Sequence, residues 1–259
     1  MNFEIHRSHG ESSSVGADFL STVDSKGSLS VFIPVYNEIN TIATCLGMVL
    51  ASQFVSDVII VDDFSSDGTR EFLKSLVDER VTVLFHEKNL GKGAAFRTAV
   101  PFAKGLFFIF QDADLEYDPR EYGVILAPLL EDRADVVYGS RYVGGSGRRV
   151  LRFWHSIGNK ALTFISNCFT NLYLTDMATC YKCFKLEMLV SLQTKEKRFG
   201  IDPEITALIA KKKWRLIEVG VSYSGRSYDQ GKKIKLKDAF RHIYCIIKYR
   251  FSVVDDFAH

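Results

Sequence analysis

The sequence predicts an α/β protein in which a mainly parallel central sheet is flanked by helices. Two observations lead to this prediction. Short runs of β-branched and aromatic residues alternate with segments of helical spacing over the first 140 residues, a pattern typical of βαβ units. The chain has 259 residues and is 47% hydrophobic, which is enough to bury one substantial core.

Five buried strands are expected first, each a short apolar run that ends in polar or turn-forming residues. They are predicted at residues 31–35, 57–63, 81–87, 105–112 and 134–141. Helical spacing and a glycine-opened turn predict helices between them, at residues 41–50, 70–77 and about 91–103. Because ligands bind at the carboxyl ends of the strands in open parallel sheets, we expect a site at that edge.

The second half of the chain is expected to add helices and one loop. Residues 151–174 carry an apolar face at helical spacing, for which core packing and membrane contact both stay open. Its members are Trp154, Ile157, Ala161, Ile165, Phe169 and Leu172. Residues 201–212 predict a helix with an Asp-Pro start and a basic end. Residues 222–233 are Gly-rich and basic and predict a flexible loop, whereas 236–251 predict an amphipathic basic helix.

Composition divides the chain into three regions. Residues 1–27 are polar, rich in Ser and Gly and without period, so we expect a mobile tail. Residues 28–235 form the expected α/β domain, and residues 236–259 the C-terminal basic helix and tail. No apolar run approaches the length of a membrane-spanning helix, and the N-terminus lacks the pattern of a signal peptide. We therefore expect a protein in the cytosol or facing it.

Charge is concentrated near the C-terminus. From Lys211 to Arg250 there are 12 Lys or Arg against three acidic residues, whereas the rest of the chain is net negative. Such a cationic surface would attract nucleic acid, anionic lipid or a phosphorylated substrate. No nucleic-acid-binding motif accompanies it, so we expect no nucleic-acid partner. The odd count of five cysteines argues against a disulfide framework, and Cys180 and Cys183 are interpreted as partly buried thiols, with zinc or redox chemistry as the alternative.

An acidic turn follows the fourth predicted strand in the stretch "FIFQDADLEYDP". Asp112, Asp114 and Glu116 lie at every second position there. Carboxylate oxygens suit hard cations such as Mg²⁺ or Mn²⁺, which take their remaining ligands from water and substrate phosphates. Taken alone, the turn fits either an ordinary acidic loop or a cation site for a nucleotide or another diphosphate.

Six motifs give the chain a resemblance to a known family. They are "FIPVYNE", "IIVDDFSSDGT", "NLGKGAA", "QDADLEYDP", "GSRY" and "VSYSGRSYDQGKK". In order and separation they resemble the inverting family-2 glycosyltransferases with the GT-A fold, a Rossmann-like α/β architecture. The similarity extends from about Leu29 to Phe251 and is greatest to the branch of dolichyl-phosphate mannosyltransferase and bacterial polyprenyl-phosphate glycosyltransferases.

The resemblance implies a nucleotide-sugar site at the strand ends. Asp63 would accept a hydrogen bond from a base N–H, and the loop that carries Arg226 would close over the donor diphosphate. The matched positions are Pro34, Tyr36, Glu38, Val61, Asp63, Lys92, Asp112, Ala113, Asp114, Arg141, Arg226 and Lys232.

The resemblance also implies metal-binding and catalytic positions. Asp112 and Asp114 match the DxD motif, in which Asp114 would bind the metal and the diphosphate. Glu116 matches a further metal-ligand position that is often Gln in relatives. Arg152 matches, with Arg141, cationic positions for the phosphate of the acceptor. The implied catalytic residues are Asp114, Arg226, Arg152 and Asp202, the last at the position of the family's base.

These implications define the expected function. It is a Mg²⁺- or Mn²⁺-dependent inverting transfer of a sugar from a UDP- or GDP-hexose to a polyprenyl phosphate. The enzyme would lie on the cytosolic face of a membrane, bound to its surface or to a membrane-embedded partner subunit. One alternative is a family-2 enzyme that acts on a sugar or glycolipid hydroxyl, with Asp202 as base.

Other classes of protein are less consistent with the sequence. A metal-dependent phosphatase with Asp112 as nucleophile leaves Asp63 and Arg226 unexplained. A non-catalytic sugar-nucleotide-binding subunit would not need the full set of metal, diphosphate and loop residues. A Rossmann dehydrogenase is excluded because Phe96 stands where its last glycine should be, and a P-loop NTPase because its motif is absent.

Overall fold

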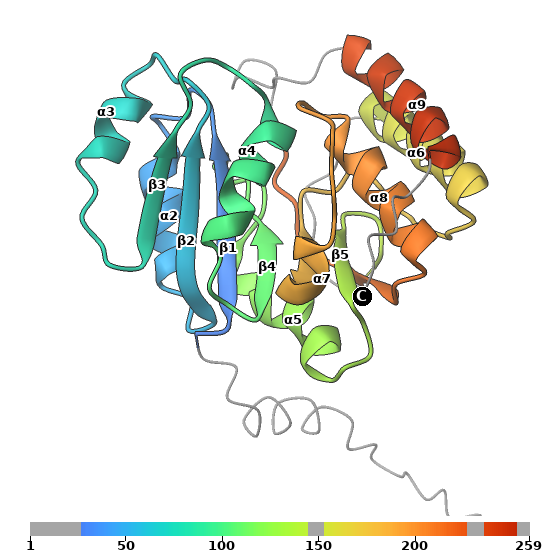
Figure 1. Ribbon diagram of the computed structural model, residues 1–259, viewed down its shortest axis with the longest axis horizontal. Helices are drawn as coiled ribbons and strands as arrows, with labels where there is room; N and C mark the ends of the chain where they lie inside the picture. Colours follow the sequence, from blue (N-terminus) through green and yellow to red (C-terminus); the bar gives the residue numbers. More distant parts are fainter. Residues whose placement is uncertain (1–26, 145–152, 227–235, 253–259) are drawn as a thin grey trace, which may run out of the picture.

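The computed structural model describes residues 27–144, 153–226 and 236–252, which form a sheet with helices packed around it (Figure 1). The sheet has seven strands in the order β3-β2-β1-β4-β6-β5-β7. Their bounds are β1 Leu29–Val35, β2 Val55–Asp62, β3 Val81–Phe85, β4 Phe107–Phe110, β5 Val136–Ser140, β6 Lys182–Lys185 and β7 Leu216–Gly220.

Pairing within the sheet confirms a mainly parallel arrangement. Strand β1 pairs in parallel with β2 and β4, and β2 with β3. Strand β6 is antiparallel to both β4 and β5, and β7 returns to a parallel pairing with β5. In register, Val35 lies opposite Asp62, and Asp62 opposite Phe85, so the three strands end together. The polar residues that follow them are therefore gathered at one edge.

Helices cover both faces of the sheet and add a layer beside it. In Figure 1, α4 lies in front of the strands and α2 behind them, while α6, α8 and α9 stand together next to the β5–β7 half. The helices are α2 Ile42–Leu50, α3 Thr69–Lys74, α4 Lys92–Ala99, α5 Tyr122–Leu130, α6 Phe153–Thr170, α7 Leu186–Val190, α8 Ile201–Lys212 and α9 Leu236–Phe251. Two short 3-10 helices span Val100–Phe102 and Pro119–Glu121.

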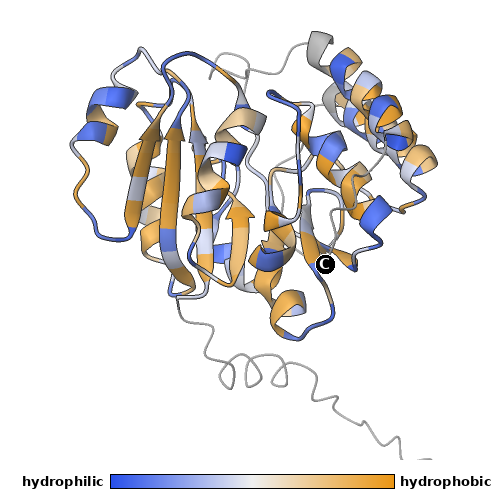
Figure 2. Cartoon of the chain, viewed as in Figure 1, coloured by the Kyte–Doolittle hydropathy of each residue, from blue (hydrophilic) through white to orange (hydrophobic). Residues whose placement is uncertain are grey.

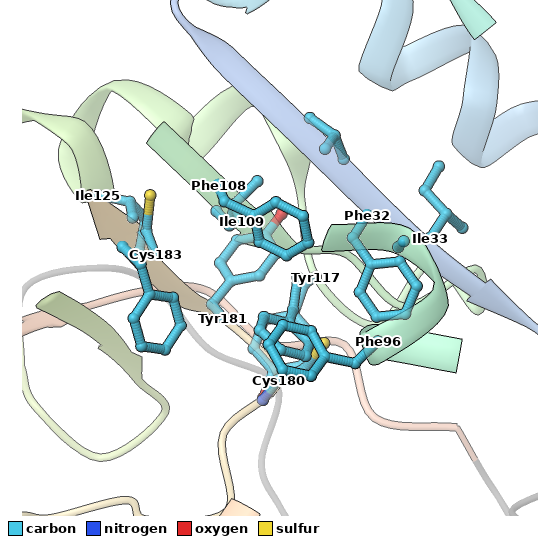
Figure 3. Close-up of a cluster of buried hydrophobic side chains, with 14 of the residues drawn as sticks. Phe32, Ile33, Phe96, Phe108, Ile109, Tyr117, Ile125, Cys180, Tyr181 and Cys183 are labelled. Atoms are coloured by element: carbon cyan, nitrogen blue, oxygen red, sulfur yellow. The ribbon is translucent and has the colours of Figure 1, made fainter. Parts of the chain in front are cut away.

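Aromatic packing fixes α4 against the sheet. Figure 3 shows Phe96 of α4 beside Phe32 of β1, with the ring centroids 6.2 Å apart. Phe110 of β4 stacks on Phe96 at 4.9 Å and meets Phe32 edge-on at 5.4 Å. Buried rings contribute both apolar area and ring geometry to stability. Phe96, the residue that excluded a dinucleotide-binding fingerprint, thus sets the position of the helix that begins with Lys92.

Hydropathy along the chain explains which elements the sequence revealed. The central strands are mostly apolar (Figure 2), and those of the first half were predicted. Strands β6 and β7 and helices α5 and α7 were not predicted. Strand β6 has only four residues and β7 is half-buried throughout, so neither produces a clear periodic pattern.

Two further expectations concern the ends of the chain and the membrane. Residues 1–26 lie outside the described residues, and so does the greater part of the predicted tail at 1–27. The predicted C-terminal helix is present as α9. Within the three described ranges, no helix combines the length and apolar character needed to cross a bilayer.

Candidate active site

The carboxyl edge of the sheet brings together side chains from three distant parts of the sequence. Glu38 follows β1, Asp114 follows β4, and Arg226 follows β7. Arg226 donates one hydrogen bond to each carboxylate oxygen of Glu38, both at 3.0 Å, and its Nη2 lies 3.2 Å from Oδ2 of Asp114. Burial would lower the pKa of Arg226, but Glu38 and Asp114 raise it above its ordinary value. The guanidinium therefore stays charged between two carboxylates.

Glu116 holds the loop that carries Arg226. Its carboxylate accepts hydrogen bonds from the backbone N–H of Arg226 at 2.8 Å and from the hydroxyl of Tyr223 at 2.6 Å. Its carbonyl accepts one from the N–H of Ser224 at 2.9 Å. The extra charge that distinguishes Glu116 from the usual Gln is thus engaged with the loop, which is a role that the sequence did not indicate.

The acidic turn places Asp114 in an environment that perturbs its pKa. Leu115 adopts φ +62°, which turns the chain so that the N–H of Glu116 donates to Oδ1 of Asp114 at 3.1 Å. Burial and the neighbouring charges of Asp112 and Glu116 raise the pKa of Asp114 to about 7, against a lowering effect of Arg226. Additional positive charge at this position would therefore stabilise the ionised carboxylate.

The three predicted metal ligands, Asp112, Asp114 and Glu116, have different partners in the structure. Among the described residues, no group of three or more His, Cys, Asp or Glu side chains is placed to hold a metal ion. The carboxylate of Glu116 accepts hydrogen bonds from Tyr223 and the loop backbone, and its role as a metal ligand with Asp112 and Asp114 stays a prediction. The remaining oxygen donors still fit a hard cation, because such ions are commonly held by one or two carboxylates plus substrate oxygens and water.

Lys92 pairs with Asp112 at the start of α4. Its Nζ lies 2.7 Å from Oδ1 of Asp112 and 3.5 Å from Sγ of Cys180. Burial would lower the pKa of Lys92, but Asp112 raises it well above the ordinary value, so the amine is charged. All five cysteines are free, and Cys180 and Cys183 are both buried, in agreement with their interpretation as thiols.

Asp63 organises the loop before Lys92. Its carboxylate accepts hydrogen bonds from the N–H of Leu90 at 2.8 Å and of Gly91 at 2.7 Å. His86, directly after β3, places Nδ1 2.8 Å from the same carboxylate, whose environment is buried. Three of the roughly four acceptor positions of a carboxylate are thus used within the protein. The sequence did not single out His86, which lies near the end of the strand predicted at residues 81–87.

Other predicted nucleoside positions differ in what their side chains can offer. Val61 and Ala113 are buried in the core, and Pro34 lies opposite Val61 in the β1–β2 register. Their side chains therefore shape the backbone of this edge. Tyr36 is 39% exposed and presents an aromatic surface near the strand ends.

Arg141 is held rigidly by a partner that the sequence did not identify. Its Nε and Nη2 donate to the two oxygens of Asp176, each at 2.7 Å, and the guanidinium lies 5.1 Å from the ring centroid of Tyr223. Asn159 donates to the same carboxylate at 3.2 Å. Bidentate pairs of this type fix orientation as well as charge. The other predicted cations, Arg152 and Lys232, lie outside the described residues.

Asp202 forms a buried ion pair. Nζ of Lys182 lies 2.6 Å from Oδ1 of Asp202 and also donates to the carbonyl of Thr179. Burial would raise the pKa of Asp202, but Lys182 and Lys92 lower it below its usual range. A carboxylate whose pKa is lowered is a weaker base. This environment therefore makes Asp202 less suited to its predicted alternative role as general base.

The mixed sheet with an acidic carboxyl edge is the architecture of a GT-A glycosyltransferase, and the chain belongs to glycosyl transferase family 2, whose model matches residues 30–189. This confirms the resemblance found in the motifs. The family and the relatives below support a transferase enzyme, so the phosphatase alternative is set aside.

Two relatives of known name match this chain over most of their own length. A UDP-N-acetylglucosamine–dolichyl-phosphate N-acetylglucosaminyltransferase of Methanococcus voltae is 25% identical over 245 residues, with 87% of this chain and 97% of the relative covered. An undecaprenyl-phosphate mannosyltransferase of Micrococcus luteus is 28% identical over 214 residues, with 77% and 85% covered.

Solved structures confirm the fold. Glucosyl-3-phosphoglycerate synthase of Mycobacterium tuberculosis, in complex with Mn²⁺, UDP and glucosyl-3-phosphoglycerate, superposes with a TM-score of 0.68 at 16% identity. The match covers 96% of this chain and 88% of that one. The same enzyme is also known with Mg²⁺ and UDP, at a TM-score of 0.66 and 18% identity, with 97% and 87% covered.

Proposed function

We propose that this glycosyltransferase moves a hexose-type sugar from a UDP- or GDP-sugar to a polyprenyl phosphate with inversion, on the cytosolic face of a membrane. The named relatives use polyprenyl phosphates. The observation that supports a phosphate acceptor over a hydroxyl acceptor is the ion pair of Asp202 with Lys182. A hydroxyl acceptor needs a base to take its proton, whereas an acceptor phosphate is already anionic at neutral pH.

The transfer would exchange one glycosyl bond for another. An oxygen of the acceptor phosphate attacks the anomeric carbon, and the bond to the donor diphosphate breaks with its electron pair leaving on the nucleoside diphosphate. Lys92 and Arg226 offer fixed positive charge beside the carboxylate edge where that diphosphate would lie. Preorganised cations of this type stabilise charge that develops in the transition state.

A divalent cation is part of the proposal. Asp114, with Asp112, would hold Mg²⁺ or Mn²⁺, which supplies Lewis-acid stabilisation of the leaving diphosphate when bound. The raised pKa of Asp114 shows that Arg226 does not fully offset burial and the charges of Asp112 and Glu116, so a bound cation would add favourable charge there. Solved relatives of the fold contain Mn²⁺ or Mg²⁺ with UDP.

The proposed membrane contact rests on two exposed apolar stripes, together called the outer face. They consist of Phe153, Trp154, Ile157 and Phe164 on α6 and Phe240, Tyr244, Ile247 and Phe251 on α9. Helices α6 and α9 pack side by side (Figure 1). Helix α6 contains no acidic residue, and α9 contains Asp238 against four Lys or Arg, which suits an anionic lipid surface.

The apolar face predicted at 151–174 is therefore divided. Trp154 and Ile157 are exposed, whereas Ile165, Phe169 and Leu172 pack partly buried against the core. Core packing and outward exposure both occur within this segment, and its exposed side chains are the part available to a membrane or a membrane-embedded partner.

Direct assay of transfer tests the proposal. The protein is incubated with Mn²⁺ or Mg²⁺, candidate UDP- and GDP-sugars and a short polyprenyl phosphate, and the product is examined by mass spectrometry. We expect a lipid-linked sugar that depends on the cation. Asp114→Asn serves as the inactive control. Transfer only to sugar hydroxyls would contradict the phosphate acceptor and favour the alternative with Asp202 as base.

A further inference from the structure

Glu196 is a buried residue outside the candidate active site at the carboxyl edge of the sheet. It lies between α7 and α8, and its side chain is only 5% exposed. One carboxylate oxygen lies 2.6 Å from Nη2 of Arg241, and the other lies 3.0 Å from Nζ of Lys248 and accepts from the hydroxyl of Tyr249 at 2.9 Å. All three partners belong to α9. Burial would raise the pKa of Glu196, but these partners lower it to about 2.

The backbone around Glu196 contacts the helix that carries Lys92. The carbonyl of Glu196 accepts a hydrogen bond from Arg97 at 2.6 Å, and the carbonyl of Lys197 accepts one from the N–H of Ala94 at 3.0 Å. A side chain at Gly93 would overlap the carbonyl of Glu196. The segment from 195 to 198 is thus packed directly against the first turn of α4.

The same segment is also hydrogen-bonded to α8. The carboxylate of Glu204 accepts hydrogen bonds from the N–H of Lys195 at 2.6 Å and of Glu196 at 2.8 Å. At the start of the same helix as Ala94, Gly91 donates to Asp63 and Lys92 reaches Asp112. The start of α4 therefore contacts both the residues that follow the strands and the segment from 195 to 198. The one buried charge of that segment, Glu196, is paired with α9.

We propose that Glu196 is a positioning residue for the donor site, which couples the packing of the C-terminal helix α9 to the placement of Lys92. The chain of contacts is continuous from α9, through the carboxylate and carbonyl of Glu196, to α4. Because the outer face includes α9, a partner that binds this face acts on the same contacts. The role in donor binding rests on the proposed function, whereas the coupling itself does not.

Hydrogen exchange tests the coupling without any ligand. In Glu196→Gln, which keeps the size of the side chain and removes its charge, we expect about tenfold faster exchange in peptides over residues 88–99 and in α9. Strands β1 and β2 report global stability and should not change. Glu131→Gln, which breaks an exposed pair with Arg133, is the matched control and should leave all these segments unaltered.

Donor binding separates positioning from general stability. With UDP and Mn²⁺ as the calorimetric probe, we expect Glu196→Gln to weaken the affinity about fivefold or more. In turnover, the donor KM should rise more than kcat falls. Arg241→Gln should weaken the affinity in the same way but less, and Arg241→Lys, which keeps the charge, should have nearly the affinity of the wild type. Since Arg241 is half exposed, this pair of variants also serves if Glu196→Gln does not fold.

The outcomes are distinct. Faster exchange in α9 with unchanged exchange at 88–99 would overturn the proposal, because Glu196 would then anchor only the C-terminal helix. If the wild-type protein does not bind UDP with Mn²⁺, the proposed function fails, while the exchange data still decide whether the coupling exists.

Discussion

Arg226 donates a hydrogen bond to each carboxylate oxygen of Glu38 although the two residues are 188 positions apart in the chain. The contact joins the end of β1 to the loop after β7 across the acidic turn. Arg226 forms ion pairs with both Glu38 and Asp114 and partly offsets their two negative charges. Donor binding would bring further negative charge to the same guanidinium, so this residue is the first target for mutation.

Arg226→Ala should reduce turnover more than donor affinity, if its charge mainly stabilises the leaving diphosphate. We expect kcat to fall about 10²- to 10³-fold, the range seen when one preorganised donor is removed from an active site. Steady-state kinetics with the transferred sugar as product measures this. Arg120→Ala, an exposed arginine paired with Asp118, is the control. A change confined to KM would instead indicate plain ground-state binding.

Asp114→Asn should remove the dependence of donor binding on the metal. The carboxylate is the proposed ligand, and an amide is a much poorer partner for a hard cation. Calorimetry of UDP binding with and without Mn²⁺ should show a metal effect in the wild type and none in the variant. Retained Mn²⁺-dependent affinity would mean that the ion is bound elsewhere.

The same variant should change the pH dependence of stability. The pKa of Asp114 is about 7 in the folded protein. Since an unfolded Asp titrates near 4, the folded state holds more protons between these values, and its stability falls as pH rises through that range. Asp114→Asn removes this loss, so urea unfolding of the ligand-free protein should show a gain at pH 8 that exceeds the gain at pH 5 by roughly 1–3 kcal/mol. Equal gains at both pH values would contradict the raised pKa.

Asp202→Asn should affect stability more than catalysis. Removing one member of a buried ion pair costs about 3–5 kcal/mol because Lys182 is left uncompensated. Transfer to a phosphate acceptor should fall less than about tenfold, whereas loss of a general base costs about 10²–10⁴-fold. Thermal unfolding and kcat are measured together, and Lys182→Met added to the variant should recover stability. A large loss of kcat that persists in the stabilised double variant would assign Asp202 to the chemistry.

Substitutions on the outer face should weaken membrane binding alone. Trp154→Ser and Phe240→Ser remove two exposed aromatic side chains, one from each helix. We expect reduced sedimentation with vesicles that contain anionic lipid, and unchanged UDP affinity. Val77→Ser is the control, because Val77 is 98% exposed and comes three residues after α3, a helix that lies at the other end of the sheet from α6 and α9 (Figure 1). Undiminished vesicle binding of both outer-face variants would place the membrane contact elsewhere.

Local pattern was sufficient for the first half of the fold. Short segments dominated by apolar residues mark β1, β2 and β3, which are 7, 8 and 5 residues long, and the polar residues after them mark the site edge. The short strand β6 was missed because its place depends on partners on both sides of the sheet rather than on its own four residues.

The sequence also did not predict which residues pair with or position the predicted site residues. Asp176, Lys182 and Glu196 each lie far along the chain from the groups that they hold or position. Ordinary Asp, Lys and Glu residues in loops or short strands give no local signal of burial, so only the tertiary structure reveals them. Glu116 shows the converse, since its position in the motif was recognised but its hydrogen bonds to Tyr223 and the loop were not.

The antiparallel strand β6 has a consequence for the order in which the chain can fold during synthesis. Strands β1 to β4 are contiguous in the sheet and are made first, so they can pair before the ribosome has released the remainder. Strand β5 has no neighbour until β6 arrives, more than 40 residues later. The segment from 195 to 198 that supports Lys92 comes later still. A nascent chain can therefore fold the half with strands β1 to β4, while the proposed donor affinity would await the last helices.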